Sequence, residues 1–178
     1  MSDILIQAVG IIAMFFNIFS YQQKTTRRII AFQLLGGLLF SINFLLLEAY
    51  IGALLNIIAT IRAILFLNKE KLKTENNIWF GIFCLAYLSV YIASFLIFKK
   101  SPTILNFIVE LLPVIGMIST TIAFRQSNTK IVRYYGLVSS ISWLIYNIFA
   151  VSIGAICCEA ISILSIFIAI WRFNKAKT

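Results

Sequence analysis

The 178-residue chain is 61% hydrophobic, has a mean hydropathy of +0.98 and carries a formal net charge of +9. Soluble domains are only about half apolar, so this composition indicates an integral membrane protein. The positive charge then indicates basic loops against anionic lipid headgroups rather than a nucleic-acid partner. The sequence has no histidine and one aspartate, Asp3, which leaves no material for histidine-zinc sites, Ser-His triads or aspartyl dyads. We expect no metal, no cofactor and no enzymatic activity.

Seven apolar stretches follow one another along the chain, each close to the roughly 20 residues that a helix needs to cross the hydrocarbon core. Continuous apolar runs such as residues 34–47 do not alternate in polarity, which favours helices over a membrane β-barrel. We therefore predict an all-α membrane protein with a single transmembrane domain over residues 1–178. The predicted spans are residues 4–21, 29–47, 49–67, 78–98, 104–124, 131–151 and 153–171.

One sequence pattern occurs twice, about a hundred residues apart. This repetition indicates an internal duplication of a three-helix unit, with copies at residues 4–67 and 104–171. Gly10 and Pro113 hold the same place in the two copies and are the candidate hinges. The paired positions are Gln7 with Glu110, Gly10 with Pro113, Met14 with Met117, Tyr21 with Phe124, Gln23 with Gln126, Asn43 with Asn147 and Gly52 with Gly154.

The basic residues indicate the orientation of the spans. Twelve of the 15 Lys and Arg residues follow the first, third, fifth and seventh spans, whereas Lys99 and Lys100 lie on the other side. Cytoplasmic loops carry the excess of Lys and Arg, so we expect the N-terminus outside and the C-terminus in the cytoplasm. Both copies then enter the membrane in one direction, and a linker helix at residues 78–98 must reverse the chain between them. The predicted topology is three plus one plus three, with a pseudo-two-fold axis along the membrane normal.

Polar side chains inside these spans are the candidate site residues, because a polar group in lipid is costly and usually marks function. Asn56, Glu110 and Glu159 each lie seven or eight residues from the outer end of their span, or roughly 10–12 Å along a helix. They should meet in one layer, slightly outside the midplane. Gln7 and Asn17 share the inward face of the first span. We predict a substrate-binding site from these five residues; the alternatives are helix contacts and an internal hydrogen-bond network.

Three further polar residues lie at other depths. Arg62 is six residues deeper than Asn56 and should point to a different face. Its long stem can carry the guanidinium to the cytoplasmic headgroups; the alternatives are an ion pair with a buried acid and a contact with substrate. Asn43 and Asn147 lie near the outer end of the second span of each copy, which favours turn or interhelical hydrogen bonds first and a gate second.

An aromatic-x-Gln sequence follows the first span of each copy, as Tyr21-x-Gln23 and Phe124-x-Gln126. It resembles a degenerate form of the PQ-loop motif of SWEET-like (MtN3-like) transporters, which share the three-one-three topology with an outer N-terminus. Nearly the whole chain more closely resembles the YgjV-type bacterial inner membrane proteins, a branch of that superfamily. The segments that carry this likeness are residues 10–23, 33–43 and 56–62.

The resemblance implies a bacterial inner membrane location and a solute site between the two copies. SWEET-like sugar sites use an Asn on the third helix of each half. Asn56 fits this place, but the second copy has Cys158 and Glu159. Those transporters also use prolines as hinges in both halves, whereas Gly10 here stands opposite Pro113. An acid in the site suits a cationic or amine-bearing solute, or proton coupling through a buried carboxyl group.

We predict a small-solute transporter that is facilitated or ion-coupled, because the sequence has no nucleotide-binding motif. The alternative is a non-transporting membrane receptor, scaffold or partner subunit with the same bundle. The expected partners are the lipid bilayer and a small solute, with no nucleic acid. A homo-oligomer is compatible with either function.

Overall fold

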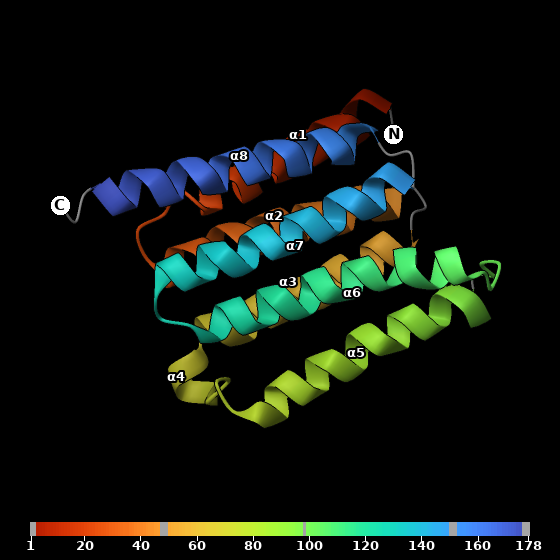
Figure 1. Ribbon diagram of the computed structural model, residues 1–178, viewed down its shortest axis with the longest axis horizontal. Coiled ribbons are helices and arrows are strands. Elements are labelled where there is room, and N and C mark those ends of the chain that lie inside the picture. The colour runs from red at the N-terminus through yellow and green to blue at the C-terminus, as the bar shows by residue number, and fades with distance from the viewer. Residues whose placement is uncertain (1–2, 47–49, 98, 150–152, 176–178) are drawn as a thin grey trace.

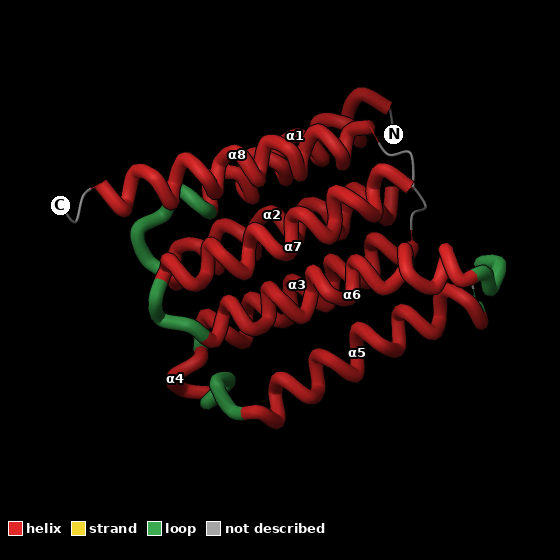
Figure 2. The backbone as a smooth tube through the Cα atoms, viewed as in Figure 1, coloured by secondary structure: helices red, strands yellow, loops and turns green. Residues whose placement is uncertain are grey.

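The computed structural model describes residues 3–46, 50–97, 99–149 and 153–175. Helix is the regular structure throughout this part of the chain, and the connecting loops are short (Figures 1 and 2). Seven helices have 18 to 23 residues, and α4 has 4. Their bounds are α1 Asp3–Ser20, α2 Thr26–Leu46, α3 Tyr50–Leu67, α4 Lys69–Leu72, α5 Asn77–Leu96, α6 Ile104–Arg125, α7 Thr129–Phe149 and α8 Ile153–Lys175.

The long helices coincide with the seven predicted apolar stretches to within a few residues, so the all-helical class is confirmed. By length and composition, four helical segments of the described chain can cross a membrane: Thr26–Leu46, Asn77–Leu96, Ile104–Arg125 and Ala155–Phe173. The apolar parts of α1 and α3 are shorter, at Ala8–Ser20 and Gly52–Leu67. Helix α7 is less apolar because serines 139, 140 and 142 lie within it. The short α4 has no counterpart among the predicted elements.

Several helices begin at a polar side chain that caps the first turn. The oxygens of Thr25, Asn76, Thr103 and Asn128 accept hydrogen bonds from backbone N–H groups two or three residues later, at 2.9–3.3 Å. Such caps satisfy N–H groups that have no partner within the helix. They explain why α2 and α7 begin two or three residues before the apolar stretches from which they were predicted.

The helices pack in two groups of three that follow the chain order. In the first group α1 packs on α2 and α2 on α3; in the second, α6 packs on α7 and α7 on α8. The groups meet where α1 contacts α8 and α3 contacts α6. Helix α5 lies outside both groups, against α6 and α3, at the lower edge of Figure 1.

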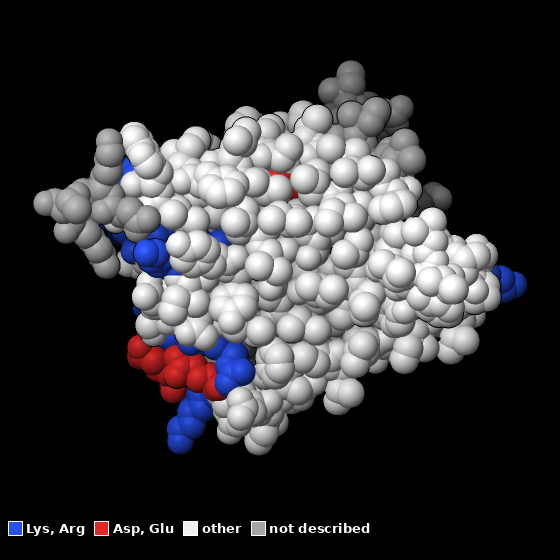
Figure 3. Space-filling model, in the orientation of Figure 1, with Lys and Arg blue, Asp and Glu red and all other residues white. Residues whose placement is uncertain are grey.

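The surface of the bundle is apolar and much of its interior is polar. Leu96 and Ile104 are 75% and 81% exposed, whereas Arg62, Glu110 and Arg133 are only 4%, 5% and 2% exposed. Charged side chains gather at the two ends of the molecule in Figure 3, and the face between them is almost uncharged. An apolar belt around buried polar groups is the arrangement that a lipid environment requires.

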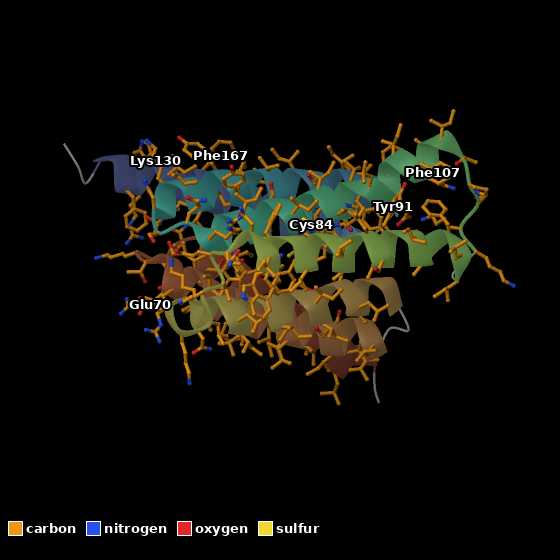
Figure 4. The ribbon with its side chains drawn as sticks, turned by 90° about the horizontal axis from the view of Figure 1, so that it is seen from below. Glu70, Cys84, Tyr91, Phe107, Lys130 and Phe167 are labelled. Atoms are coloured by element: carbon orange, nitrogen blue, oxygen red, sulfur yellow. The ribbon has the colours of Figure 1, made fainter. Side chains whose placement is uncertain are left out.

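One end of the molecule is built by α5 and α6 alone. Their connected ends extend beyond the ends of α3 and α7 in Figure 1. Tyr91 and Phe107 lie at this end in Figure 4, where the Tyr91 hydroxyl donates to the Phe107 carbonyl at 3.3 Å. The Phe107 ring also lies 4.6 Å, centroid to centroid, from that of Phe95. The first turns of α6 are therefore paired with α5 rather than with the centre of the bundle.

Candidate functional site

A cavity of about 450 Å³ lies between the two groups of helices. All six helices of the two groups contribute to its wall, whereas α5 supplies none of the described lining residues. The volume falls within the roughly 300–1,000 Å³ of small-molecule sites. Six predicted site, ion-pair or gate residues and one predicted hinge share this wall: Asn17, Asn43, Asn56, Arg62, Asn147, Glu159 and Gly10. Gln7 belongs to α1, but its side chain lies outside the described residues.

Glu110 does not join Asn56 and Glu159, contrary to the single layer that the sequence predicts. Its carboxylate forms an ion pair with Lys100, and its side chain is only 4% exposed. It lines a small separate pocket with residues of α5 and with Tyr146. The depth count assumed that all helices start at one level. Because the first turns of α6 extend beyond the bundle, Glu110 lies beside α5 instead.

The two candidate hinge positions have different surroundings. A Cβ at Gly10 would lie 3.1 Å from Nδ2 of Asn43, so glycine lets these helices approach closely. The Asn43 amide donates to the Ile6 carbonyl at 2.7 Å, which joins α2 to α1. Pro113 is buried within α6, in the small pocket beside Glu110. Proline lacks the N–H of the helical ladder, so the hydrogen bond to the residue four before it is missing there.

Arg62 lines the cavity beside Asn56, although the sequence indicated a different face and an exit to the headgroups. It is 4% exposed, and its guanidinium carbon lies 4.9 Å from the centroid of the Phe124 ring. Nη1 donates to the Tyr87 hydroxyl, the Met117 carbonyl and the Thr121 hydroxyl, at 3.0, 3.0 and 3.2 Å. The ion pair that was the alternative for Arg62 is not found among the described residues. The guanidinium therefore joins α3 to α5 and α6 through neutral groups.

Glu159 supplies the carboxylate of the cavity wall. The Ser140 side chain lies beside it and also beside the Tyr21 hydroxyl, which interacts in turn with Gln33. The sequence marked Tyr21 only as part of the repeated motif and gave no sign of Ser140 or Gln33. The pairing of residues from α2, α7 and α8 depends on the tertiary arrangement.

The amides of the first group are partly used within their own helix. The Asn56 side-chain NH₂ donates to the Gly52 carbonyl at 2.9 Å, and Thr60 donates to the Asn56 carbonyl at 2.9 Å. The carbonyl oxygen of the Asn56 side chain makes no hydrogen bond with the described residues, which leaves an acceptor on the cavity wall. A bound solute can supply its donor.

The family model for Imp-YgjV, described as bacterial inner membrane protein, matches residues 4–177. The chain belongs to this YgjV family. It is thus a multi-pass membrane protein of a bacterial inner membrane family. No curated protein and no solved structure significantly matches the chain.

In this YgjV family member the cavity is closed at the end where basic residues gather. Tyr21 and Phe124, the paired aromatic residues of the repeat, are 7% and 1% exposed there and line the cavity. Arg133 donates to the Tyr21 carbonyl at 3.1 Å and to the Gln23 carbonyl at 2.8 Å. A Cβ at Gly136 would lie 2.5 Å from Cε1 of Tyr21, so the ring packs directly on the α7 backbone.

Three further residue pairs join the groups through hydrogen bonds at the same end, one of them through the Ser165 hydroxyl, which donates to the Ile18 carbonyl at 2.9 Å. The Gln22 amide donates to the carbonyl and hydroxyl of Ser165 at 2.7 and 3.0 Å. Thr26 donates to the carbonyl of Ser127 at 3.1 Å. At the opposite end, the described residues form no hydrogen bond between the two groups. Among the described residues, the hydrogen bonds that join the two groups therefore lie at the basic end and at Arg62.

Proposed function

We propose that the protein transports a small solute across the inner membrane by alternating access, with the central cavity as its binding site. The two groups of helices move relative to one another and expose the cavity to each side in turn. The cavity is the observation that carries this proposal, because a purely structural bundle has no need of a polar space that reaches Asn56. The absence of histidine from the chain also makes an acid-base enzyme a poorer alternative.

We further propose that all seven long helices cross the membrane, in the three-one-three topology of the SWEET and PQ-loop superfamily. Helices α1–α3 and α6–α8 are the two parallel repeats, and α5 is the span that reverses the chain. Support comes from the consecutive packing within each group and from the position of α5 outside both. The end rich in Lys and Arg would face the cytoplasm, with the N-terminus outside.

In this orientation the structure corresponds to a state that is closed toward the cytoplasm. The contacts of Tyr21 with Gly136 and of Gln22 with Ser165 close the cytoplasmic end. Transport then requires these contacts to break while new contacts form between the groups at the outer end. Conformational steps of this kind often limit the rate of turnover.

Glu159 makes a positively charged or amine-bearing group the natural partner of the second half of the cavity. It lines the cavity and forms no ion pair within the described chain. A carboxylate of this kind binds an ammonium group through a charge-assisted hydrogen bond. Without a nucleotide-binding motif, the transport is facilitated or coupled to an ion gradient.

The test is uptake of a metabolite mixture by proteoliposomes that contain the purified protein, with the internal contents identified by mass spectrometry. We expect E159Q to reduce uptake of the transported solute at least about tenfold, which corresponds to the loss of one charge-assisted hydrogen bond. The matched control is E110Q. It removes a buried carboxylate that lies outside the cavity, so this variant should retain most uptake. Absence of uptake of any solute, with a folded protein, would favour the receptor or scaffold function instead.

A further inference from the structure

Arg62 is a buried cation without an anionic partner among the described residues. Its side chain lines the cavity, and the residue is 4% exposed. The ion pairs of the described chain are Lys69 with Glu75 and Lys100 with Glu110, both away from the cavity. Moving a charge out of water is costly, and neutral hydrogen-bond acceptors offset only part of that cost. The position of Arg62 therefore calls for an anion that none of the described residues supplies.

The hydrogen bonds of Arg62 use one nitrogen of the guanidinium and leave another available. All three described acceptors bind Nη1. Nε is fully buried with no acceptor, whereas Nη2 has no partner among the residues that the structure describes and is not fully buried. The N–H groups of Nη2 are therefore the ones that a carboxylate in the cavity can reach. The Phe124 ring lies over one face of the guanidinium.

Arg62 and Glu159 are the charged residues of the described cavity wall, and they are not paired with each other. One belongs to the first group of helices and the other to the second. The cavity wall thus carries one basic and one acidic side chain, whose ionised forms sum to zero. A ligand with the complementary pair of charges, also summing to zero, satisfies both without leaving a buried charge unpaired.

We propose that the cavity binds a small zwitterion with one carboxylate and one ammonium group, the chemical class of the amino acids. The carboxylate accepts hydrogen bonds from Nη2 of Arg62, and the ammonium binds Glu159. This inference rests on the proposed transport function and specifies its substrate class. Because the ligand joins the two groups of helices, its binding also couples their relative positions.

The rest of the wall suits the side chain of such a ligand. Met14, Phe40, Phe44, Met117 and Trp143 supply apolar surface within the same cavity. Apolar walls with a few oriented polar groups are the usual composition of small-molecule sites. The volume of about 450 Å³ also leaves room for the side chain of an amino acid.

The experiment measures thermal stabilisation of the purified full-length protein by each of the 20 standard amino acids. Each amino acid that raises the Tm is then compared with its amine lacking the carboxylate and with its acid lacking the amine. We expect at least one amino acid to stabilise the protein, as a ligand that binds only the folded state must. Neither the amine nor the acid should raise the Tm as much as the amino acid does at the same concentration. Uptake of the radiolabelled amino acid by proteoliposomes follows.

The variants are R62Q and, as the matched control, Y87F, which removes one acceptor of Nη1 but leaves the charge and Nη2. We expect R62Q to weaken binding of the amino acid at least about tenfold and to leave the weaker binding of the amine unchanged. Y87F should stay within about threefold of the wild type, since it removes one neutral hydrogen bond. If R62Q does not fold, the inference is tested with the wild-type protein alone, by comparing binding of the amino acid with binding of its amine and its acid.

Three results would overturn the inference: no amino acid binds or is transported, the amine binds as tightly as the amino acid, or R62Q binds the amino acid like the wild type. Glu159-dependent uptake of a solute without a carboxylate would leave the transport function in place and remove only the substrate class. Absence of any uptake would remove both.

Discussion

The two halves of the cavity wall follow one repeated pattern but differ in charge. The first half provides Arg62 with the amides of Asn17 and Asn56, whereas the second provides Glu159 with Ser140. Asn56 occupies the place in its copy that Cys158 occupies in the other. The two copies share other residues at matching positions. Asn43 and Asn147 are one such pair, and both are buried near the ends of their helices, at 6% and 7% exposed. The duplication therefore provides the scaffold, and the residues that differ between the copies provide the chemistry.

The largest effect is expected where Tyr21 packs on the other half. G136A places a Cβ 2.5 Å from Cε1 of a buried ring, whose backbone carbonyl is also held by Arg133. Overpacking of this kind should lower the free energy of unfolding by about 2 kcal/mol. G81A is the matched control, because a Cβ at Gly81 of α5 meets no atom within 4 Å. Thermal unfolding in detergent measures both, and equal stabilities would show that Tyr21 does not hold the basic end closed.

The next largest effect is expected at Glu110, the acidic residue of the second half that lies outside the cavity. K100Q removes the ionic partner of Glu110, whose side chain is 4% exposed, and should destabilise the protein by about 1.5 kcal/mol. E110Q should cost less, because it leaves behind Lys100, whose side chain is 41% exposed. It also restores the glutamine that the first copy has at Gln7. Denaturation curves of the two variants and the double variant measure this asymmetry. A larger cost for E110Q would contradict it.

The smallest effect compares the third helices of the two halves. N56A removes an amide from the cavity wall and should reduce solute affinity about fivefold, the value of one net hydrogen bond near 1 kcal/mol. C158A should change affinity less than about twofold, because a thiol is a weak hydrogen-bonding group. Titrations of the transported solute against both variants measure the difference. Equal losses would show that the halves bind the solute symmetrically.

The helices could be predicted from the sequence because a lipid-embedded chain must form long apolar helices, and each apolar stretch is one of them. Helices α2 and α7 begin two or three residues earlier than predicted, because the capping residues Thr25 and Asn128 start a polar first turn that a hydropathy pattern does not include. Asn56 and Glu159 both line the cavity, and both had been marked as site residues by counting depth along their own helices. These two residues show how far counting along separate helices can reach.

Glu110 and Arg62 show where such counting fails. The error at Glu110 comes from the extension of α6 beyond the bundle, which only the packing against α5 reveals. For Arg62, the face was judged from an isolated helix, but the contacts with Tyr87 and Thr121 depend on how α3, α5 and α6 meet. Ser140 lacked any signal at all, since a serine in a span is ordinarily a helix-packing residue. Relative depth and tilt of helices were the missing information.

The central claim is that the space between the halves is a water-accessible solute site, and Cys158 on its wall tests this most directly. In intact cells that express a C84S/C157S variant, a membrane-impermeant cationic thiol reagent should modify Cys158 from the outside, and the transported solute should slow the reaction. S101C on the same background, in the exposed α5–α6 loop, which the proposed topology places on the outer side, is the positive control for access. Complete labelling at position 101 with none at Cys158, or labelling that the solute does not slow, would contradict the account.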